Sequence, residues 1–279
     1  EEKIRKMSVQ TFVFATNTTI ATIIGCGFIG NIISFIIFSR ETFQKNSIST
    51  YYRALAIVEC LTLSNFAIAV FQLVNNQELA DQSDVLCKIL YYIPTLFNSL
   101  PAWILVAFSL DKLLSMRTRQ IAILKKKWFQ WSVVAGIVLF HIAFYIYYPI
   151  LLRLNEIFPG YIICDLTTLG FFKAYMTVDA LETCLIPFMT MTITSILTIR
   201  SLIKSRESIE RSGNLSNDRK SRDYKYAISS LSLNIIFIIL RLPGSVFYIL
   251  IAYYSYFNLY FAKIASILFF LNASLSLFI

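Results

Sequence analysis

Residues 87–117 have the sequence CKILYYIPTLFNSLPAWILVAFSLDKLLSMR. The segment begins with Cys87, is apolar and uncharged over 89–110, and ends with Asp111-Lys112 and further basic residues. A helix from Cys87 to Asp111 would be about 36 Å long, slightly more than the hydrocarbon thickness of a bilayer. The segment therefore predicts a transmembrane helix with a cysteine at one membrane face and a charge pair at the other.

The composition extends this prediction to the whole chain. Of 279 residues, 57% are hydrophobic and 15% charged, and the mean hydropathy is +0.66, which is too apolar for one soluble core. Seven segments are long enough to span a bilayer: 18–39, 54–74, 89–110, 128–152, 174–199, 226–255 and 257–279. Such segments form helices in lipid because a helix satisfies its own backbone groups. We expect an all-α membrane protein, a seven-transmembrane helix bundle in a single domain.

The distribution of charge predicts the orientation. Most of the basic residues lie in the loops around 40–53, 117–127 and 200–225. Cytoplasmic loops carry an excess of Lys and Arg, so we expect the amino terminus and Cys87 outside the cell. Residues 201–223 are rich in Ser, Arg, Lys, Glu and Asn, which predicts a flexible cytoplasmic loop. We expect a multi-pass protein of the plasma membrane, in contact with lipid and not with nucleic acid, in spite of its net charge of +9.

The ends of the chain and its sequon give three further expectations. No cleavable signal peptide is evident, so the first apolar segment is expected to direct insertion. We expect more chain, including a cytoplasmic tail, beyond residue 279. Asn17-Thr18-Thr19 is a glycosylation sequon on the outer side, although a chance match explains it equally well.

The five cysteines fall into two groups. Cys26, Cys60 and Cys184 lie within apolar segments, where we expect unpaired small hydrophobic side chains. Cys87 and Cys164 lie at a segment edge or in a loop. They are the natural disulfide pair if both face an oxidising compartment.

Several landmarks occur in the order and spacing of one receptor family. They are Gly30-Asn31, the sequence LAIVE at 55–59, Pro187, Phe237 with Pro243, and NASLSLFI at 272–279. Together with the cysteine and the acid-base pair of residues 87–117, they resemble rhodopsin-like (class A) G protein-coupled receptors. The resemblance implies an extracellular ligand, a heterotrimeric G protein as partner, and a ligand-driven population shift that opens a cytoplasmic cleft beside Lys112. It also implies that Cys87 and Cys164 hold the second outer loop over the ligand pocket.

The resemblance also suggests the class of ligand. Trp103-Ile104-Leu105-Val106 and Ser109-Leu110-Asp111 look like invertebrate neuropeptide receptors of the FMRFamide-receptor type. Pro94 occupies the position of the aspartate of amine receptors, and Phe270 that of the retinal-binding lysine of opsins. A peptide is therefore the expected ligand. A chemosensory receptor for small molecules is the nearest alternative, and a transporter or channel the next.

The resemblance assigns a cytoplasmic switch. Asp111-Lys112-Leu113 stands where the family has Asp-Arg-Tyr, and lysine lacks the planar fork of arginine. Asp223 lies where the sixth helix approaches the third in this family. We expect an inactive-state pair between Lys112 and Asp223, with a solvated loop carboxylate as an equal alternative.

Glu59 stands where the family has an intramembrane aspartate that helps to bind sodium. An ionisable residue in mid-membrane is typical of a functional position. However, Pro101 and Ser276 replace the serine and asparagine expected beside it, which argues against sodium. We therefore expect a polar relay of Asn31, Glu59 and Asn272, and no cofactor or metal.

Arg241 lies two residues before Pro243, where the family usually has tryptophan. A guanidinium there needs a carboxylate or an anionic ligand group. Asp179 and Glu182, three residues apart on one helical face, are the candidate partners. We expect these three residues to form the polar floor of the ligand pocket, with Asn98 and Tyr91 also in contact with ligand. A purely structural ion pair is the alternative.

Enzyme chemistry finds no support in the sequence. The single histidine, His141, lies in an apolar segment without a metal-spaced partner, and a satisfied buried histidine is expected there. No phosphate-binding glycine loop or nucleophile motif occurs. We expect a protein that is not an enzyme.

Overall fold

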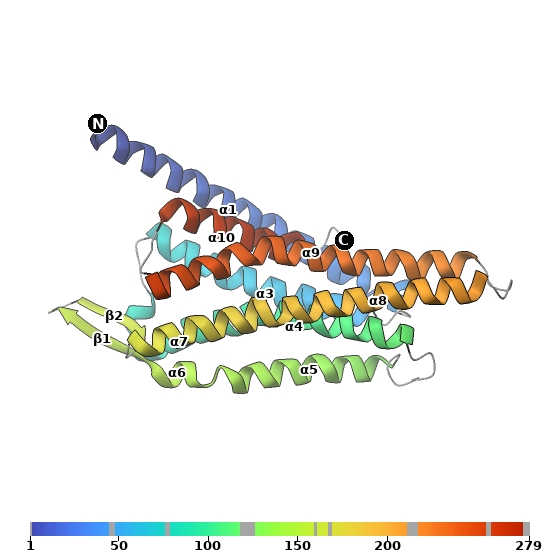
Figure 1. Ribbon diagram of the computed structural model, residues 1–279. Helices are drawn as coiled ribbons and strands as arrows, with labels where there is room; N and C mark the ends of the chain where they lie inside the picture. The colour runs from blue at the N-terminus through green and yellow to red at the C-terminus, as the bar shows by residue number, and fades with distance from the viewer. Residues whose placement is uncertain are drawn as a thin grey trace.

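The computed structural model describes residues 2–44, 48–75, 79–117, 126–158, 161–166, 169–210, 217–254 and 258–275. The first half contains α1 (Glu2–Phe38), α2 (Glu41–Gln44), α3 (Ile48–Asn75), the 3₁₀ turn η1 (Leu79–Gln82), α4 (Asp84–Arg117), α5 (Lys127–Phe144) and α6 (Tyr147–Leu151). The second half contains β1 (Leu152–Phe158), β2 (Tyr161–Leu166), α7 (Leu169–Ala180), the π-helical turn η3 (Leu181–Leu185), α8 (Ile186–Glu210), α9 (Asn217–Tyr254) and α10 (Leu259–Leu275). The long helices run side by side, with the hairpin at one end (Figure 1).

Helix α4 occupies the centre of the bundle. It packs against α3, α5, α8 and α9, while α1 packs against α3 and α10, and α9 against α7, α8 and α10. Of the long apolar helices it is also the most buried. Its side chains Leu100, Ile104 and Phe108 join Tyr51 of α3 and Phe237 of α9 in the main hydrophobic cluster. The segment 87–117 is thus confirmed as one helix, and its burial explains why it is apolar on every face.

The structure is that of a helical multi-pass membrane protein. Among the described residues, six helical spans are long and apolar enough to cross a membrane: Thr11–Phe38, Ser49–Gln72, Asp84–Ser115, Lys127–Leu151, Lys173–Ser201 and Asn234–Ile251. A shorter apolar helix covers Leu259–Ser274. Large apolar side chains are exposed on outer helices, among them Phe14, Ile29, Ile33 and Ile36 of α1, Leu139 and Phe140 of α5, and Met189, Ile193 and Ile196 of α8. A surface of this kind is typical of contact with lipid.

Several helices extend beyond their predicted bounds. Helix α8 continues to Glu210 and α9 begins at Asn217, so 201–210 and 217–223 of the predicted flexible loop are helical, and 211–216 lie outside the described residues. The Lys, Arg and Glu residues of this region are good helix formers, which favours continuation of both helices beyond their apolar parts. Helix α1 likewise begins at Glu2, well before the predicted start at residue 18.

Two predicted helices are interrupted. The segment 128–152 divides into α5, a turn at Tyr145-Ile146 and α6. The segment 174–199 divides into α7, the π turn η3 and α8. Both interruptions occur close to a proline, Pro149 in the first case and Pro187 in the second.

A β-hairpin that the sequence did not predict follows α6 directly. Strands β1 and β2 are antiparallel, with Leu152 opposite Leu166 and Leu154 opposite Cys164, and the register shifts between Glu156 and Phe158. Figure 1 shows the hairpin projecting from the end of the bundle where α6 ends and α7 begins.

Candidate functional site

A cavity of about 310 Å³ lies between the helices. Its aromatic wall consists of Phe66, Tyr148, Tyr175, Phe247, Phe269 and Phe270. Its polar lining consists of Thr95, Asn98, Asp179, Thr183, Arg241, Ser245 and Ser266. Tyr148 and Tyr175 also belong to the hydrophobic cluster around Cys87 and Cys164, so the cavity lies close to the hairpin end of the bundle. A concave, mainly apolar site with a few convergent polar groups is typical of ligand binding.

Arg241 is the cation of the cavity. Its side chain is 7% exposed, its Nη2 donates to the carbonyl oxygen of Asn98, and its guanidinium carbon lies 4.2 Å from the ring centre of Phe269. A desolvated cation–π contact contributes about 2 kcal/mol. Among the described residues, no carboxylate oxygen lies within 4.0 Å of the guanidinium. The structure thus shows no direct ion pair of Arg241 with Asp179 or Glu182, the alternative considered above; a carbonyl and an aromatic ring contact the guanidinium instead.

The contact of Arg241 with Asn98 follows from a proline in α4. Pro101 lies inside the helix, where it removes the N–H that would bond the carbonyl of Phe97. The hydroxyl of Thr62 on α3 lies 3.1 Å from that carbonyl and 3.0 Å from the carbonyl of Val58 in its own helix, so the two carbonyls share its one proton. The next carbonyl, that of Asn98, accepts from Arg241. The irregular turn before Pro101 thus joins α4 to α3 on one side and to α9 on the other.

Glu182 does not line the cavity. Its Oε1 lies 2.6 Å from Nε2 of His141, and its Oε2 accepts from the hydroxyl of Tyr145 at 2.5 Å. All three side chains are buried. Glu182 thus ties η3 to α5, and its predicted place in the pocket floor is wrong. His141 is a satisfied buried histidine, as predicted, because its Nδ1 also lies 2.7 Å from the carbonyl oxygen of Ile137.

The π turn that carries Glu182 has a local cause. The N–H of Ile186 donates to the carbonyl of Leu181, five residues earlier. The carbonyl of Glu182 would then need the N–H of residue 187, but Pro187 has none. Nε1 of Trp103 on α4 donates to this carbonyl at 3.2 Å. The bulge is therefore held from the central helix, and π turns of this kind are frequent at functional sites.

Tyr145 connects this buried cluster to the cavity. Its hydroxyl lies 2.5 Å from Oε2 of Glu182 and 3.4 Å from Oδ1 of Asp179. Asp179 lines the cavity, as predicted. A hydroxyl has one proton to donate, so the shorter contact with Glu182 is the dominant hydrogen bond. The remaining acceptor capacity of Asp179 faces the cavity.

The residues of the predicted polar relay lie on three neighbouring helices. Asn31 on α1 and Glu59 on α3 are buried, and Asn272 on α10 is half-buried. Nδ2 of Asn31 donates to the carbonyl of Ala273 at 3.0 Å, next to Asn272 in the chain. The bond places Asn31 against α10, and the relay itself stays a prediction.

The predicted cytoplasmic switch is described only in part. Asp111 is buried and Lys112 is half-buried near the end of α4. Asp223 lies in α9, but its side chain is outside the part of the chain whose side chains the structure describes. The pairing of Lys112 with Asp223 therefore stays a prediction.

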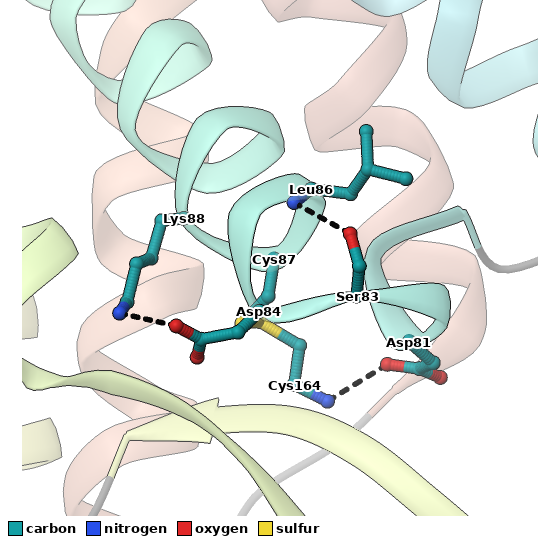
Figure 2. Close-up of a disulfide and its surroundings, with 7 residues drawn as sticks. All are labelled: Asp81, Ser83, Asp84, Leu86, Cys87, Lys88 and Cys164. Carbon is teal, nitrogen blue, oxygen red and sulfur yellow. Dashed lines mark hydrogen bonds and ion pairs between the residues drawn. A yellow bond between two sulfur atoms is a disulfide. The ribbon is translucent and has the colours of Figure 1, made fainter.

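The disulfide between Cys87 and Cys164 is confirmed, with the two Cα atoms 5.6 Å apart. It joins the first turns of α4 to β2, and the N–H of Cys164 donates to Asp81 in η1 at 2.7 Å (Figure 2). The hairpin is thus fixed to the bundle by one covalent bond and one charge-assisted hydrogen bond. Cys26, Cys60 and Cys184 are free, as predicted.

Two predicted residues do not fit their expected roles. Tyr91 is exposed and does not line the cavity. Asn17 lies inside α1, in a candidate membrane span, and its Oδ1 accepts from Nζ of Lys263 at 2.7 Å. Glycosylation uses asparagines in surface loops, so this position does not suit a glycan. The sequon is better explained as a chance match.

Other residues of the cavity were absent from the sequence-based prediction. Tyr145 and the hydroxyl groups of Thr95, Thr183, Ser245 and Ser266 lie in or beside the cavity. These residues could have been suspected from the sequence, because they are polar residues that lie at similar distances from the ends of neighbouring apolar segments. Helix rotation decides which of them face inward, and the π turn changes that rotation.

Comparison with protein-family models and with curated protein sequences found no match. The function is therefore argued from the arrangement of these residues.

Proposed function

We propose that this protein is a seven-transmembrane receptor of the rhodopsin-like type, which binds an extracellular ligand in the cavity and activates a heterotrimeric G protein. The cavity near the hairpin end carries the proposal. It is lined by residues of α3, α4, α6, α7, η3, α9 and α10, so a ligand there would contact most of the bundle at once. A ligand with different affinities for two helix arrangements shifts the population between them.

The proposal takes α10 as a seventh span. With 17 residues, α10 is about 26 Å long, and a bilayer accommodates a short span by local thinning. Its start is capped by Asn258, whose Oδ1 accepts from the N–H of Phe261 at 3.1 Å. With an odd number of spans the two ends of the chain lie on opposite sides of the membrane. The amino terminus and the hairpin then face outward, and the charge pair of α4 faces the G protein.

The disulfide supports the outward orientation of the hairpin. Disulfides persist in oxidising compartments, and the bond lies at the end of α4 opposite Asp111 and Lys112. A pinned hairpin beside the cavity would shape the entrance for ligand. A neuropeptide placing one terminal residue in the cavity is the ligand we favour.

A chemosensory receptor for small molecules is the second candidate, and the volume of the cavity favours it. At about 310 Å³, the cavity lies at the lower end of the usual range for ligand pockets, roughly 300 to 1,000 Å³. Both candidates share the fold, the cavity and the coupling step, and they differ in the ligand.

The test is G protein activation in cells that express the protein at their surface, screened with short peptides, small organic acids and amines. We expect one class to activate, Lys112→Ala to abolish the response, and Lys112→Arg to raise it because arginine supplies more donors. Surface-expressed protein that activates no G protein with any of these ligands, and shows no basal activation, would contradict the proposal. Loss of the response in Lys112→Ala at unchanged ligand binding would separate coupling from recognition.

A further inference from the structure

The guanidinium of Arg241 is incompletely satisfied. An arginine has five N–H donors, and in the described part of the chain this one makes a single hydrogen bond, from Nη2 to the carbonyl of Asn98. Its Nε is fully enclosed and has no hydrogen-bond partner among the described residues. A buried charge without a counter-ion is costly. The side chain therefore has donors and positive charge available for a further group.

The charge of Arg241 is felt by three carboxylates, those of Glu59, Asp179 and Glu182, but among the described residues none of them lies within 4.0 Å of the guanidinium. Asp179, the anion of the cavity, lies beyond ion-pair distance of Arg241 and accepts from Tyr145 at 3.4 Å. Glu182 is engaged by His141 and Tyr145. Asn98 also has an enclosed Oδ1 without a hydrogen-bond partner in the described structure. Both of these atoms belong to residues that line the cavity, one on α4 and one on α9.

We propose that the cavity binds the carboxylate of its ligand through Arg241. The carboxylate would accept from the terminal N–H groups of Arg241, and the amide of Asn98, which also lines the cavity, would lie beside it. The rings of Phe269 and Phe247 would cover the apolar body of the ligand. Asp179, on the other wall, would accept from an N–H group of the ligand. This inference rests on the proposed function and specifies the ligand of the same site.

The size of the cavity limits the ligand. Its volume of about 310 Å³ lies at the lower end of the range found for ligand pockets, so the part of a ligand that it holds is small. A small arylalkyl carboxylate meets this limit, and so does the last residue of a peptide with a free carboxyl terminus. A small arylalkyl acid and a peptide terminus share the carboxylate that Arg241 would bind, and they differ in the rest of the molecule.

The test uses matched acids and amides on the purified full chain in lipid nanodiscs, with the thermal unfolding midpoint as readout. Phenylacetate and phenylacetamide represent small molecules, and acetylphenylalanine and its amide represent a peptide terminus. Bound ligand raises the midpoint in a concentration-dependent way. We expect at least one acid to stabilise the protein and its amide to bind about tenfold or more weakly, the loss expected for a hydrogen bond to a charged group. The acid that raises the unfolding midpoint more shows whether the ligand is a small molecule or the carboxyl terminus of a peptide.

Arg241→Met should abolish the effect of the acid, and Arg241→Lys should retain part of it. Lys263→Met is the matched control, because Lys263 is another cation within the helices that bonds Asn17 and does not line the cavity. The midpoints without ligand show whether each variant folds. Equal stabilisation by acid and amide, acid binding that survives in folded Arg241→Met, or no stabilisation of the wild type by either acid would overturn the inference.

These outcomes are separable from failure of the proposed function. Binding of the amide alone would overturn the carboxylate assignment and leave a ligand-binding cavity. Acid binding that depends on Arg241, in a protein that activates no G protein, would overturn the receptor function and leave this inference in place.

Discussion

Nε2 of His141 lies 2.6 Å from Oε1 of Glu182, while Nδ1 of the same ring lies 2.7 Å from the carbonyl oxygen of Ile137. Both ring nitrogens are thus engaged, one by the backbone of α5 and one by the carboxyl group carried by η3. The pair therefore fixes the π turn against α5.

A double-mutant cycle tests this pair. His141→Leu or Glu182→Leu alone should lower the free energy of unfolding by about 3 kcal/mol, because each leaves a buried polar partner behind. The double variant should cost less than the sum by about 2 kcal/mol. Denaturant unfolding of the purified protein measures all three. Ser132→Ala, at an exposed position of α5, is the control and should combine additively with Glu182→Leu. Additive effects of His141→Leu and Glu182→Leu would contradict the pairing.

The Thr62 hydroxyl and the carbonyl of Phe97 give a second prediction. Thr62→Val should destabilise the protein by about 1 kcal/mol, because the carbonyl freed by Pro101 loses its donor. In a Pro101→Ala background the same change should cost less, since the new N–H of residue 101 can bond the carbonyl of Phe97. The measurement is again the free energy of unfolding. Equal costs in both backgrounds would show that the proline does not create the need for Thr62.

Close approach of α1 and α10 gives a third prediction. A Cβ at Gly27 would lie 2.2 Å from Oγ of Ser274 and 2.8 Å from its Cβ. Gly27→Ala should therefore destabilise the protein by about 1–3 kcal/mol through overpacking. Ser274→Gly should restore part of the loss. Gly25→Ala is the matched control, because a Cβ there meets nothing within 4 Å, and it should be neutral or slightly stabilising. Similar effects at both glycines would mean that the two helices do not approach as described.

The disulfide gives a fourth prediction. Cys164→Ser should lower the stability by about 2–4 kcal/mol and raise hydrogen exchange in β1 and β2, which lose their covalent attachment to α4. Asp81→Asn should have a smaller effect, because the disulfide remains. Ligand binding should be impaired before membrane insertion. The control is Cys26→Ser, at an exposed free cysteine. Unchanged exchange in the hairpin of Cys164→Ser would show that other contacts hold it.

The sequence predicts the features that depend on length, hydropathy and position along the chain. The helix α4 is an uninterrupted apolar segment, and Cys87 and Cys164 are the cysteines outside such segments. These features need no knowledge of how side chains meet. The helix and the disulfide follow from them, whereas the central position and the burial of α4 are known only from the structure.

The partners of Arg241 and Glu182 could not be predicted in the same way. Both depend on the rotation of their helices, and a π turn shifts that rotation at Glu182. The carbonyl that Arg241 contacts is a backbone group, which has no signature in the sequence of α9. The hairpin was missed because its strands are short and follow a helix without a break. Local propensity is a weak guide where tertiary contacts decide the conformation.

The bond between Cys87 and Cys164 also closes the chain into a covalent ring that contains α4, α5, α6 and β1. Cleavage of the backbone once between α4 and α5 would open this ring without dividing the molecule. The two fragments would migrate as one species until a reductant is added. An intact band on a non-reducing gel is therefore no proof of an intact polypeptide for this protein, and preparations should be checked in the reduced state.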